Sequence, residues 1–218
     1  MQAAHTSNGV LGLFGGTFDP VHRAHLALAG AALSGLALES VRWIPSGQPG
    51  HRGAPGAPVA DRLRMLELAM AGEPRYSLDP ADALAAAPTY TINTLRRLRA
   101  ELGDRQPLVV LIGMDQLIGL STWRDWKDLF ALAHFGVAER AGEDAESMPA
   151  EVKAELDARQ AHASAMASRP GGAIARFGMP PMAVSASMVR ARIAARRPVG
   201  DLLPPAVLDY IHSKQLYE

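Results

Sequence analysis

The chain has 218 residues, of which 48% are hydrophobic, and its 22 basic side chains are balanced by 22 acidic ones, for a formal net charge of zero. That length suits one domain with a sizeable core, and the charge balance argues against a strongly basic nucleic-acid surface. The absence of cysteine excludes disulfides, thiolate zinc sites and cysteine nucleophiles.

No stretch approaches the roughly 20 apolar residues that a membrane span requires. The first nine residues also lack the cationic and then apolar pattern of a signal peptide. We therefore expect a cytoplasmic protein that binds neither nucleic acid nor membranes.

Short apolar runs alternate with segments of helical periodicity. Strands are predicted at 10–14, 40–45, 107–113 and 134–140, and helices at 22–33, 59–72 and 91–103, the last two closed by Gly72 and Gly103. The buried faces of these two helices are predicted to carry Leu63, Leu66 and Met70, and Ile92, Leu95, Leu98 and Leu102. Strand–helix alternation indicates an α/β fold with a doubly wound, Rossmann-like and mostly parallel sheet flanked by helices.

The second half of the chain is less regular. Residues 141–172 form a variable insert whose alanine-rich middle is compatible with a helix, and 185–218 is predicted to be a helical C-terminal portion. Its last helix should begin after the prolines at 204–205 and turn Val207, Leu208 and Ile211 inward. Together with a flexible N-terminus (1–9), these parts are expected to form one domain spanning 1–218.

The stretch "VLGLFGGTFDPVHRAHLALAG" (10–30) carries the clearest chemical signal. An apolar strand would lead to the ligand-binding edge of the sheet, where Gly15 and Gly16 allow backbone N–H groups to approach an anion. The following helix would aim its N-terminus at the same place, with His22 and His25 on one face. Each feature alone is often only a turn or a surface histidine, but together they predict a phosphate site.

Other phosphate and catalytic motifs are absent. The stretch is neither the G-x-G-x-x-G dinucleotide fingerprint nor the G-x-x-x-x-G-K-[ST] phosphate loop. The H-x-x-H spacing lacks further zinc ligands, and the chain contains no G-x-S-x-G hydrolase motif.

A second candidate anion site is "VSASMVRARI" (184–193). Ser185 at a helix N-cap, Ser187 and Arg190 one turn further on can together bind a phosphate through hydroxyl, N–H and guanidinium donors.

The two stretches resemble the two signatures of the nucleotidylyltransferase superfamily. "GGTFDPVHRAH" (15–25) is similar to G-x-[ST]-F-D-P-x-H-x-[GA]-H, with Ala24 where glycine is usual. "SASMVR" (185–190) is similar to the S-S-T-x-[IV]-R part of the second signature, with Ala186 and Ser187 in place of serine and threonine.

Four further stretches resemble bacterial nicotinate-nucleotide adenylyltransferases: "IPSGQPGHR" (44–52), "PTYTINTLRRLR" (88–99), "LIGMDQLIGLSTWRDWKDLF" (111–130) and "LLPPAVLDYIHSKQLY" (202–217). The chain departs from the family at Gly50 and Arg52, which replace proline and lysine, and around Arg140, where the usual "RPG" is missing.

The resemblance implies the reaction of ATP with nicotinate mononucleotide to give deamido-NAD and pyrophosphate, a step of NAD biosynthesis. It implies His22, His25 and Arg190 as catalytic residues. The implied ATP-binding residues are Gly15, Gly16, Thr17, Phe18, His22, His25, Asp115, Ser185, Ser187 and Arg190. The implied nicotinate mononucleotide-binding residues are Arg52, Thr91, Trp123 and Arg124.

Individual roles follow from the same resemblance. Asp115 should contact a ribose hydroxyl, Arg52 the mononucleotide phosphate, and Trp123 the pyridine ring. Thr91 and the backbone of Trp123 and Arg124 should bind the nicotinate carboxylate. A Mg²⁺ ion is expected to arrive with ATP and to need no protein side chains as ligands.

Several alternatives stay open at this point. The acceptor could be nicotinamide mononucleotide or phosphopantetheine, or the chain could be a nucleotide-binding sensor without activity. Asp19 is either a supporting group of the site or a turn former, and the protein is either a monomer or a homodimer.

Overall fold

The structure is a computed structural model that describes residues 9–47, 55–139 and 148–218. Arg52, which is predicted to bind the mononucleotide phosphate, lies outside the described residues. So do residues 1–8 of the predicted flexible N-terminus and the first part of the variable insert.

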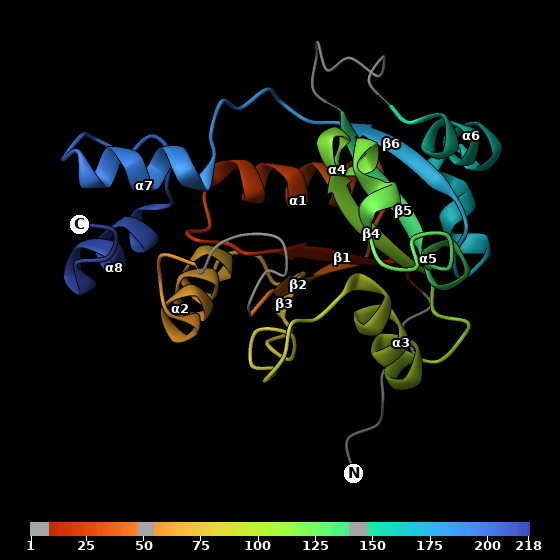
Figure 1. Ribbon diagram of the computed structural model, residues 1–218, viewed down its shortest axis with the longest axis horizontal. Coiled ribbons are helices and arrows are strands. Elements are labelled where there is room, and N and C mark those ends of the chain that lie inside the picture. The colour runs from red at the N-terminus through yellow and green to blue at the C-terminus, as the bar shows by residue number, and fades with distance from the viewer. Residues whose placement is uncertain (1–8, 48–54, 140–147) are drawn as a thin grey trace.

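Six strands form one parallel sheet in the order β3-β2-β1-β4-β5-β6 (Figure 1). The strands are β1 (Leu11–Gly16), β2 (Ser40–Pro45), β3 (Tyr76–Leu78), β4 (Leu108–Gly113), β5 (His134–Glu139) and β6 (Ile174–Gly178). The chain winds outward in one direction from β1 and in the other from β4, so the strand order reverses between these two strands. The predicted doubly wound α/β fold is confirmed.

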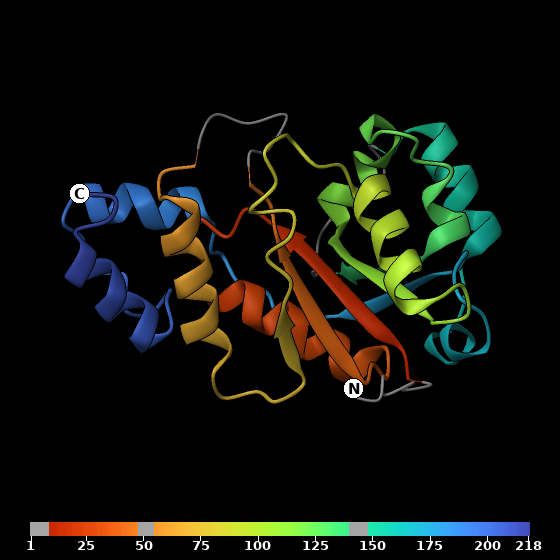
Figure 2. The same ribbon diagram turned by 90° about the horizontal axis from the view of Figure 1, so that it is seen from below.

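Helices cover both faces of this sheet (Figure 2). They are α1 (Arg23–Gly35), α2 (Val59–Met70), α3 (Thr91–Leu102), α4 (Met114–Ile118), α5 (Leu129–Leu132), α6 (Ala150–Arg159), α7 (Ala186–Ala194) and α8 (Pro205–Lys214), with 3₁₀ turns at η1 (Leu120–Thr122) and η3 (Ala163–Ser168).

Two apolar cores lie on opposite faces of the sheet because neighbouring residues of a strand point to opposite sides. In β4, Val109 and Leu111 pack with α1, α2, α7 and α8, whereas Val110 and Ile112 pack with α3, α4, α5 and α6. All four side chains are buried, which explains why this strand reads as a continuous apolar run.

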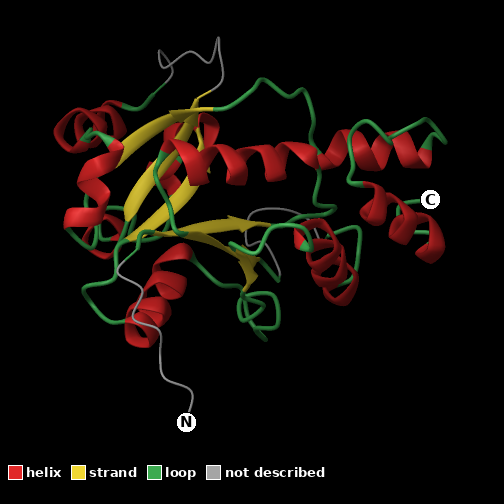
Figure 3. Ribbon diagram, turned by 180° about the vertical axis from the view of Figure 1, so that it is seen from behind, coloured by secondary structure: helices red, strands yellow, loops and turns green. Residues whose placement is uncertain are grey.

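Helices α7 and α8 lie at one end of the molecule, where α8 contacts α2 (Figure 3).

Two boundaries that were predicted at glycines were wrong. Strand β1 does not stop at Phe14 but continues through both glycines, with Gly15 paired to Ile44 and Gly16 to Pro45. Helix α2 ends at Met70 with Ala71 as its C-cap, so Gly72 does not close it. The cap is an ordinary right-handed residue, and no glycine is needed there.

Two strands, β3 and β6, were not predicted. Both are edge strands, and only one neighbour pairs with each of them. Strand β3 has three residues and none of them is buried, and β6 exposes Arg176 between buried neighbours. An edge strand has less apolar surface to cover than a central one, so its sequence signal is weak.

Within the described ranges, no helix combines the length and the apolar character needed to cross a membrane.

Candidate active site

Two clefts meet at the carboxyl end of β1, beside the point where the strand order reverses. One has a volume of about 230 Å³ and the other about 500 Å³. We call the smaller one the ring cleft, bordered by Tyr90, Thr91 and Trp123, and the larger one the phosphate cleft, bordered by His22, His25 and Arg190. Gly15, Gly16, Thr17 and Gln116 border both, so the clefts are halves of one site.

The end of β1 allows close approach because Gly16 has no side chain. A Cβ atom at this position would lie 2.9 Å from the ring of Phe18, which packs against Gly16. Phe18 itself adopts a left-handed backbone conformation (φ 50°), and its ring is buried against Phe14 and Trp43. The Phe18 ring therefore supports the floor of the phosphate cleft, and its role in ATP binding stays a prediction.

The two histidines stand at the start of α1. His22 is the N-cap residue and His25 the third residue of the helix, and their rings stack with centroids 3.7 Å apart. The backbone N–H of His22 donates to Nδ1 of His25 at 3.2 Å. Because Nδ1 accepts this bond, a neutral His25 carries its proton on Nε2.

The surroundings of His25 favour that neutral form. Its ring packs edge-on against Phe14 and Phe18, with centroids 6.0 and 5.0 Å away. Burial, and secondarily the adjacent His22, hold the pKa of His25 well below its usual value. At neutral pH, His25 is therefore a fixed hydrogen-bond donor through Nε2.

The second signature reaches the first across 171 positions of sequence. The Nη1 group of Arg190 on α7 donates to the backbone oxygen of Asp19 at 2.7 Å and lies 3.5 Å from its Oδ2. Ser185 caps α7 by accepting from the backbone N–H of Met188 at 3.2 Å, and it borders the phosphate cleft with Arg190. Ser187 does not border the cleft, but its hydroxyl lies 3.0 Å from that of Ser185.

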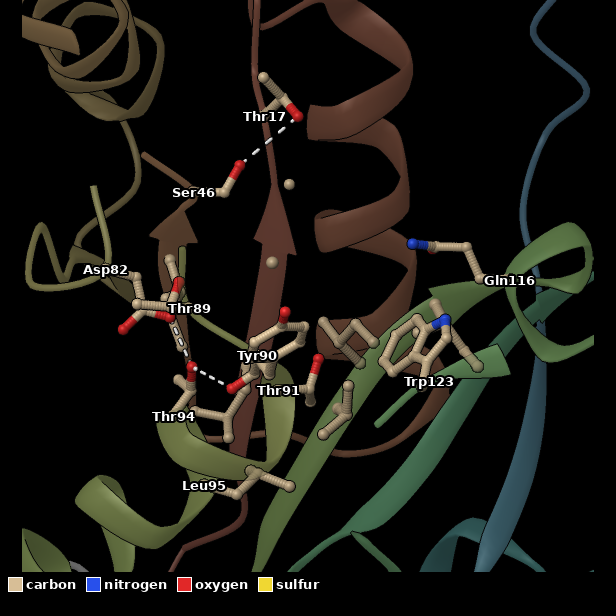
Figure 4. Close-up of a pocket in the computed structure, with 17 residues that line it drawn as sticks. Thr17, Ser46, Asp82, Thr89, Tyr90, Thr91, Thr94, Leu95, Gln116 and Trp123 are labelled. Atoms are coloured by element: carbon tan, nitrogen blue, oxygen red, sulfur yellow. Dashed lines mark hydrogen bonds between the residues drawn. The ribbon is translucent and has the colours of Figure 1, made fainter. Parts of the chain in front are cut away.

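The ring cleft is framed by two aromatic side chains and the start of α3 (Figure 4). Thr91 is the first residue of this 12-residue helix and borders the cleft, so the N-terminus of the helix, where backbone N–H groups lack helical partners, lies at the cleft. Trp123 is partly buried in the lining of the cleft, and it also packs on the core that contains Val110 and Ile112. Arg124 is exposed outside the lining, with its guanidinium 5.0 Å from the centre of the Tyr90 ring.

Asp115, the second residue of α4, borders the phosphate cleft with an exposed side chain. Across the ring cleft, the hydroxyl of Thr94 donates to the carboxylate of Asp82, and Arg97 lies 3.5 Å from the same carboxylate. The sequence interpretation did not include Asp82, because no motif marks it.

Arg62 on α2 is a further residue that the sequence interpretation missed. Its side chain is 1% exposed, and its guanidinium donates to the backbone oxygens of Thr17 at 2.6 Å, Ser46 at 2.8 Å and Gly47 at 3.1 Å. Burial lowers its pKa. Arg62 thus joins the loops that follow β1 and β2, and so fixes one wall of the site.

A signal for Arg62 was present in the sequence. It stands three and four positions before Met65 and Leu66, the fully buried residues of the same helix. An arginine within the buried stripe of a helix needs partners, and it is a candidate for a structural role.

The described part of the chain contains no group of three or more His, Asp or Glu side chains that could hold a metal ion. The donors that border the phosphate cleft are imidazoles, a guanidinium, hydroxyls and backbone N–H groups, which suit phosphate oxygens.

Comparisons with known proteins identify the family of the chain. A family model described as cytidylyltransferase-like matches residues 13–192. A protein of Dechloromonas aromatica is 49% identical over 95% of this chain and 97% of its own length, and one of Chromobacterium violaceum is 49% identical over 96% and 99%. Both are named "probable nicotinate-nucleotide adenylyltransferase".

A solved structure has the same fold at low sequence identity. The nicotinic acid mononucleotide adenylyltransferase of Plasmodium falciparum, complexed with NaAD, superposes with a TM-score of 0.71 at 16% identity, covering 96% of this chain and 97% of that one.

The fold and the paired signatures define a nucleotidyltransferase of the cytidylyltransferase-like class. Within that class, the chain belongs to the nicotinate-nucleotide adenylyltransferase family.

Proposed function

We propose that this chain transfers the adenylyl group of ATP to nicotinate mononucleotide, with the triphosphate in the phosphate cleft and the mononucleotide in the ring cleft. The observation that carries the proposal is the convergence of the β1 glycines, His22, His25 and Arg190 on one cleft, directly beside a second cleft with an aromatic wall. The names of the relatives support the same reaction.

The nucleophile in this reaction is a phosphate oxygen of the mononucleotide. It attacks the α-phosphorus of ATP, a new P–O–P linkage forms, and the bond from the α-phosphorus to the bridging oxygen breaks as pyrophosphate leaves. The protein supplies no nucleophile, so its contribution is to align two polyanions and to stabilise the charge that moves to the leaving group.

The residues of the phosphate cleft match that requirement. His25 would donate its Nε2 proton in a hydrogen bond to a phosphate oxygen, and Arg190, which borders the cleft, would bind the departing pyrophosphate through its guanidinium. Preorganised donors of this kind each contribute about 3–4 kcal/mol to lowering the barrier. ATP enters with Mg²⁺, which phosphate oxygens and water hold well.

Selection of the acid would take place in the ring cleft. The start of α3, where Thr91 borders the cleft, would bind a carboxylate, since a helix N-terminus favours negative charge. Trp123 offers its indole to the pyridine ring. An uncharged carboxamide would gain less from the same helix N-terminus.

We place the reaction in the cytoplasm, where ATP is available.

Pyrophosphate release tests the proposal. The purified chain is incubated with MgATP and, in separate reactions, nicotinate mononucleotide, nicotinamide mononucleotide, phosphopantetheine or no acceptor. Preferred release with the nicotinate compound supports the assignment. Equal or greater turnover of the amide or of phosphopantetheine would overturn it, and release with no acceptor at all would identify a hydrolase.

A further inference from the structure

The tail of the chain touches the first signature. The hydroxyl of Tyr217, the next-to-last residue, donates to Oδ1 of Asp19 at 2.8 Å, although the two are 198 positions apart. Figure 1 shows the C-terminus beside α7, the helix that carries Arg190. The tail turns back toward the site because Gln215 and Tyr217 adopt left-handed conformations after the end of α8, with φ of 52° and 69°.

Asp19 is buried, at 4% exposure, and its carboxylate accepts from three donors. Besides the Tyr217 hydroxyl, the backbone N–H groups of Gly56 and Ala57 donate at 2.6 and 3.0 Å. Two of these three bonds end on Oδ1, which uses both lone pairs of that oxygen. The carboxylate is thereby held in one orientation.

Arg190 belongs to the same cluster. A Cβ atom on Gly56 would lie 3.2 Å from Cδ of Arg190 and 3.2 Å from the Tyr217 ring, so both side chains pack on one piece of backbone. The short bond of Arg190 is to the backbone oxygen of Asp19, at 2.7 Å, whereas the Asp19 carboxylate is 3.5 Å away. The guanidinium is therefore hydrogen-bonded to the backbone of Asp19, and its ion pair with the buried Asp19 carboxylate is the longer contact.

We propose that Tyr217 is a positioning residue that acts through Asp19 to keep the Arg190 guanidinium available to the ATP triphosphate. This inference rests on the proposed function of the phosphate cleft. With Oδ1 occupied, the Asp19 carboxylate cannot rotate into a bidentate pair with Arg190, which is the geometry that such pairs prefer. Removing the hydroxyl leaves Oδ1 with the N–H of Ala57 as its remaining donor, and the less constrained Asp19 carboxylate then competes with the triphosphate for the guanidinium.

A tyrosine hydroxyl suits this role because it stays protonated. Burial, together with the hydrogen bond to Asp19, raises the pKa of Tyr217 far above its usual range. Tyr217 is therefore a donor at neutral pH, and it adds no charge that would compete with ATP.

The test compares Tyr217→Phe with Tyr210→Phe. Tyr210 lies on α8, and its hydroxyl donates to Oδ1 of Asp61 on α2 at 2.8 Å, outside both clefts, so it is a matched control. For Tyr217→Phe we expect the Kd of MgATP by calorimetry and the KM for ATP to rise about tenfold, the size expected for one hydrogen bond to a charged group. The KM for nicotinate mononucleotide should stay within about twofold, and Tyr210→Phe should change neither constant.

The Arg190→Ala background separates positioning from general stability. If Tyr217 acts through Arg190, then Tyr217→Phe should not weaken MgATP binding further once Arg190 is gone. A further loss of similar size in that background would overturn the inference, as would wild-type MgATP affinity in the single variant. If Tyr217→Phe unfolds, the chain that ends at residue 216 takes its place, with the same two outcomes.

Failure of this inference is distinguishable from failure of the proposed function. If neither the wild type nor Tyr210→Phe releases pyrophosphate in the presence of nicotinate mononucleotide, then the proposed function is wrong. With normal release and unchanged MgATP affinity in Tyr217→Phe, only the positioning role is wrong.

Discussion

Arg62 holds together two loops that border the site, so its replacement should lower the free energy of unfolding of the protein. Its guanidinium donates to backbone oxygens of Thr17, Ser46 and Gly47, which follow β1 and β2. Arg62→Met keeps an unbranched apolar stem of similar length but removes every donor. The three carbonyl oxygens then lose a charged partner. Because Arg62 is only 1% exposed, this loss takes place in the protein interior.

The size of the effect follows from how well water can replace the lost donor. A buried polar group left without a partner costs about 1–3 kcal/mol. Gly47 is buried, whereas Thr17 and Ser46 are partly exposed and can bind water instead. The free energy of unfolding should therefore fall by about 3–5 kcal/mol, which is less than three times the upper limit for one unpaired group. This is still a large share of the roughly 5–15 kcal/mol that stabilises a typical domain.

Equilibrium unfolding in urea measures this loss, and Arg64→Met is the matched control. Arg64 lies on the same helix but is exposed, and its salt bridge at 2.8 Å is to Glu67, which is also exposed. Such a pair is worth less than about 1 kcal/mol. If Arg62→Met loses no more stability than Arg64→Met, then the three hydrogen bonds do not hold the loops together and the reasoning is wrong.

Three further predictions concern the two clefts. His25→Ala should lower kcat by about 10²–10³, the effect of removing one preorganised donor, with an unchanged circular dichroism spectrum; near-normal turnover would remove His25 from the mechanism. Trp123→Ala should raise the KM for nicotinate mononucleotide about tenfold, since ring stacking is worth about 1–3 kcal/mol. Trp126 lies outside the ring cleft, so Trp126→Ala should leave this KM unchanged. Equal effects of the two substitutions would contradict the stacking role of Trp123. Burial and, to a smaller extent, His22 lower the pKa of His25. Below about pH 6.5 the unfolded chain therefore binds a proton at His25 that the folded chain does not bind. The contribution of the neutral imidazole to stability is fully present above about pH 6.5 and is lost as the pH drops below it. The loss of unfolding free energy between pH 7.5 and 5.5 should therefore be smaller in His25→Ala than in the wild type, and equal losses would contradict the lowered pKa.

The central strands were predictable because burial on both faces leaves a plain pattern. Strand β4 is a continuous apolar run that is buried on both sides, and β1 and β2 bury most of their apolar residues. Edge strands such as β3 give no such signal. The extension of β1 through Gly16 could not be read from the sequence, because two consecutive glycines favour a turn over a strand.

Much of the phosphate cleft was predictable because its parts are local. His22 and His25 lie within one turn of one helix, so their shared face follows from spacing alone. The bond between Arg190 and Asp19 joins segments far apart in sequence, and only the resemblance of each to a signature suggested that they meet.

Tertiary contacts outside the two signatures could not be predicted. Tyr217 touches Asp19 because the chain turns back after α8, and no pattern in the last residues marks that turn. Arg62 could have been flagged as an arginine in a buried stripe, but its three carbonyl partners come from two separate loops.

The most direct measurement is a crystal structure with a non-hydrolysable ATP analogue, Mg²⁺ and nicotinate mononucleotide. We predict the triphosphate in the phosphate cleft, within hydrogen-bond distance of the Gly16 and Thr17 region, the His25 imidazole and the Arg190 guanidinium. The pyridine ring should lie in the ring cleft against Trp123. A triphosphate bound elsewhere, or one that contacts His25 while Arg190 stays remote from it, would contradict the account.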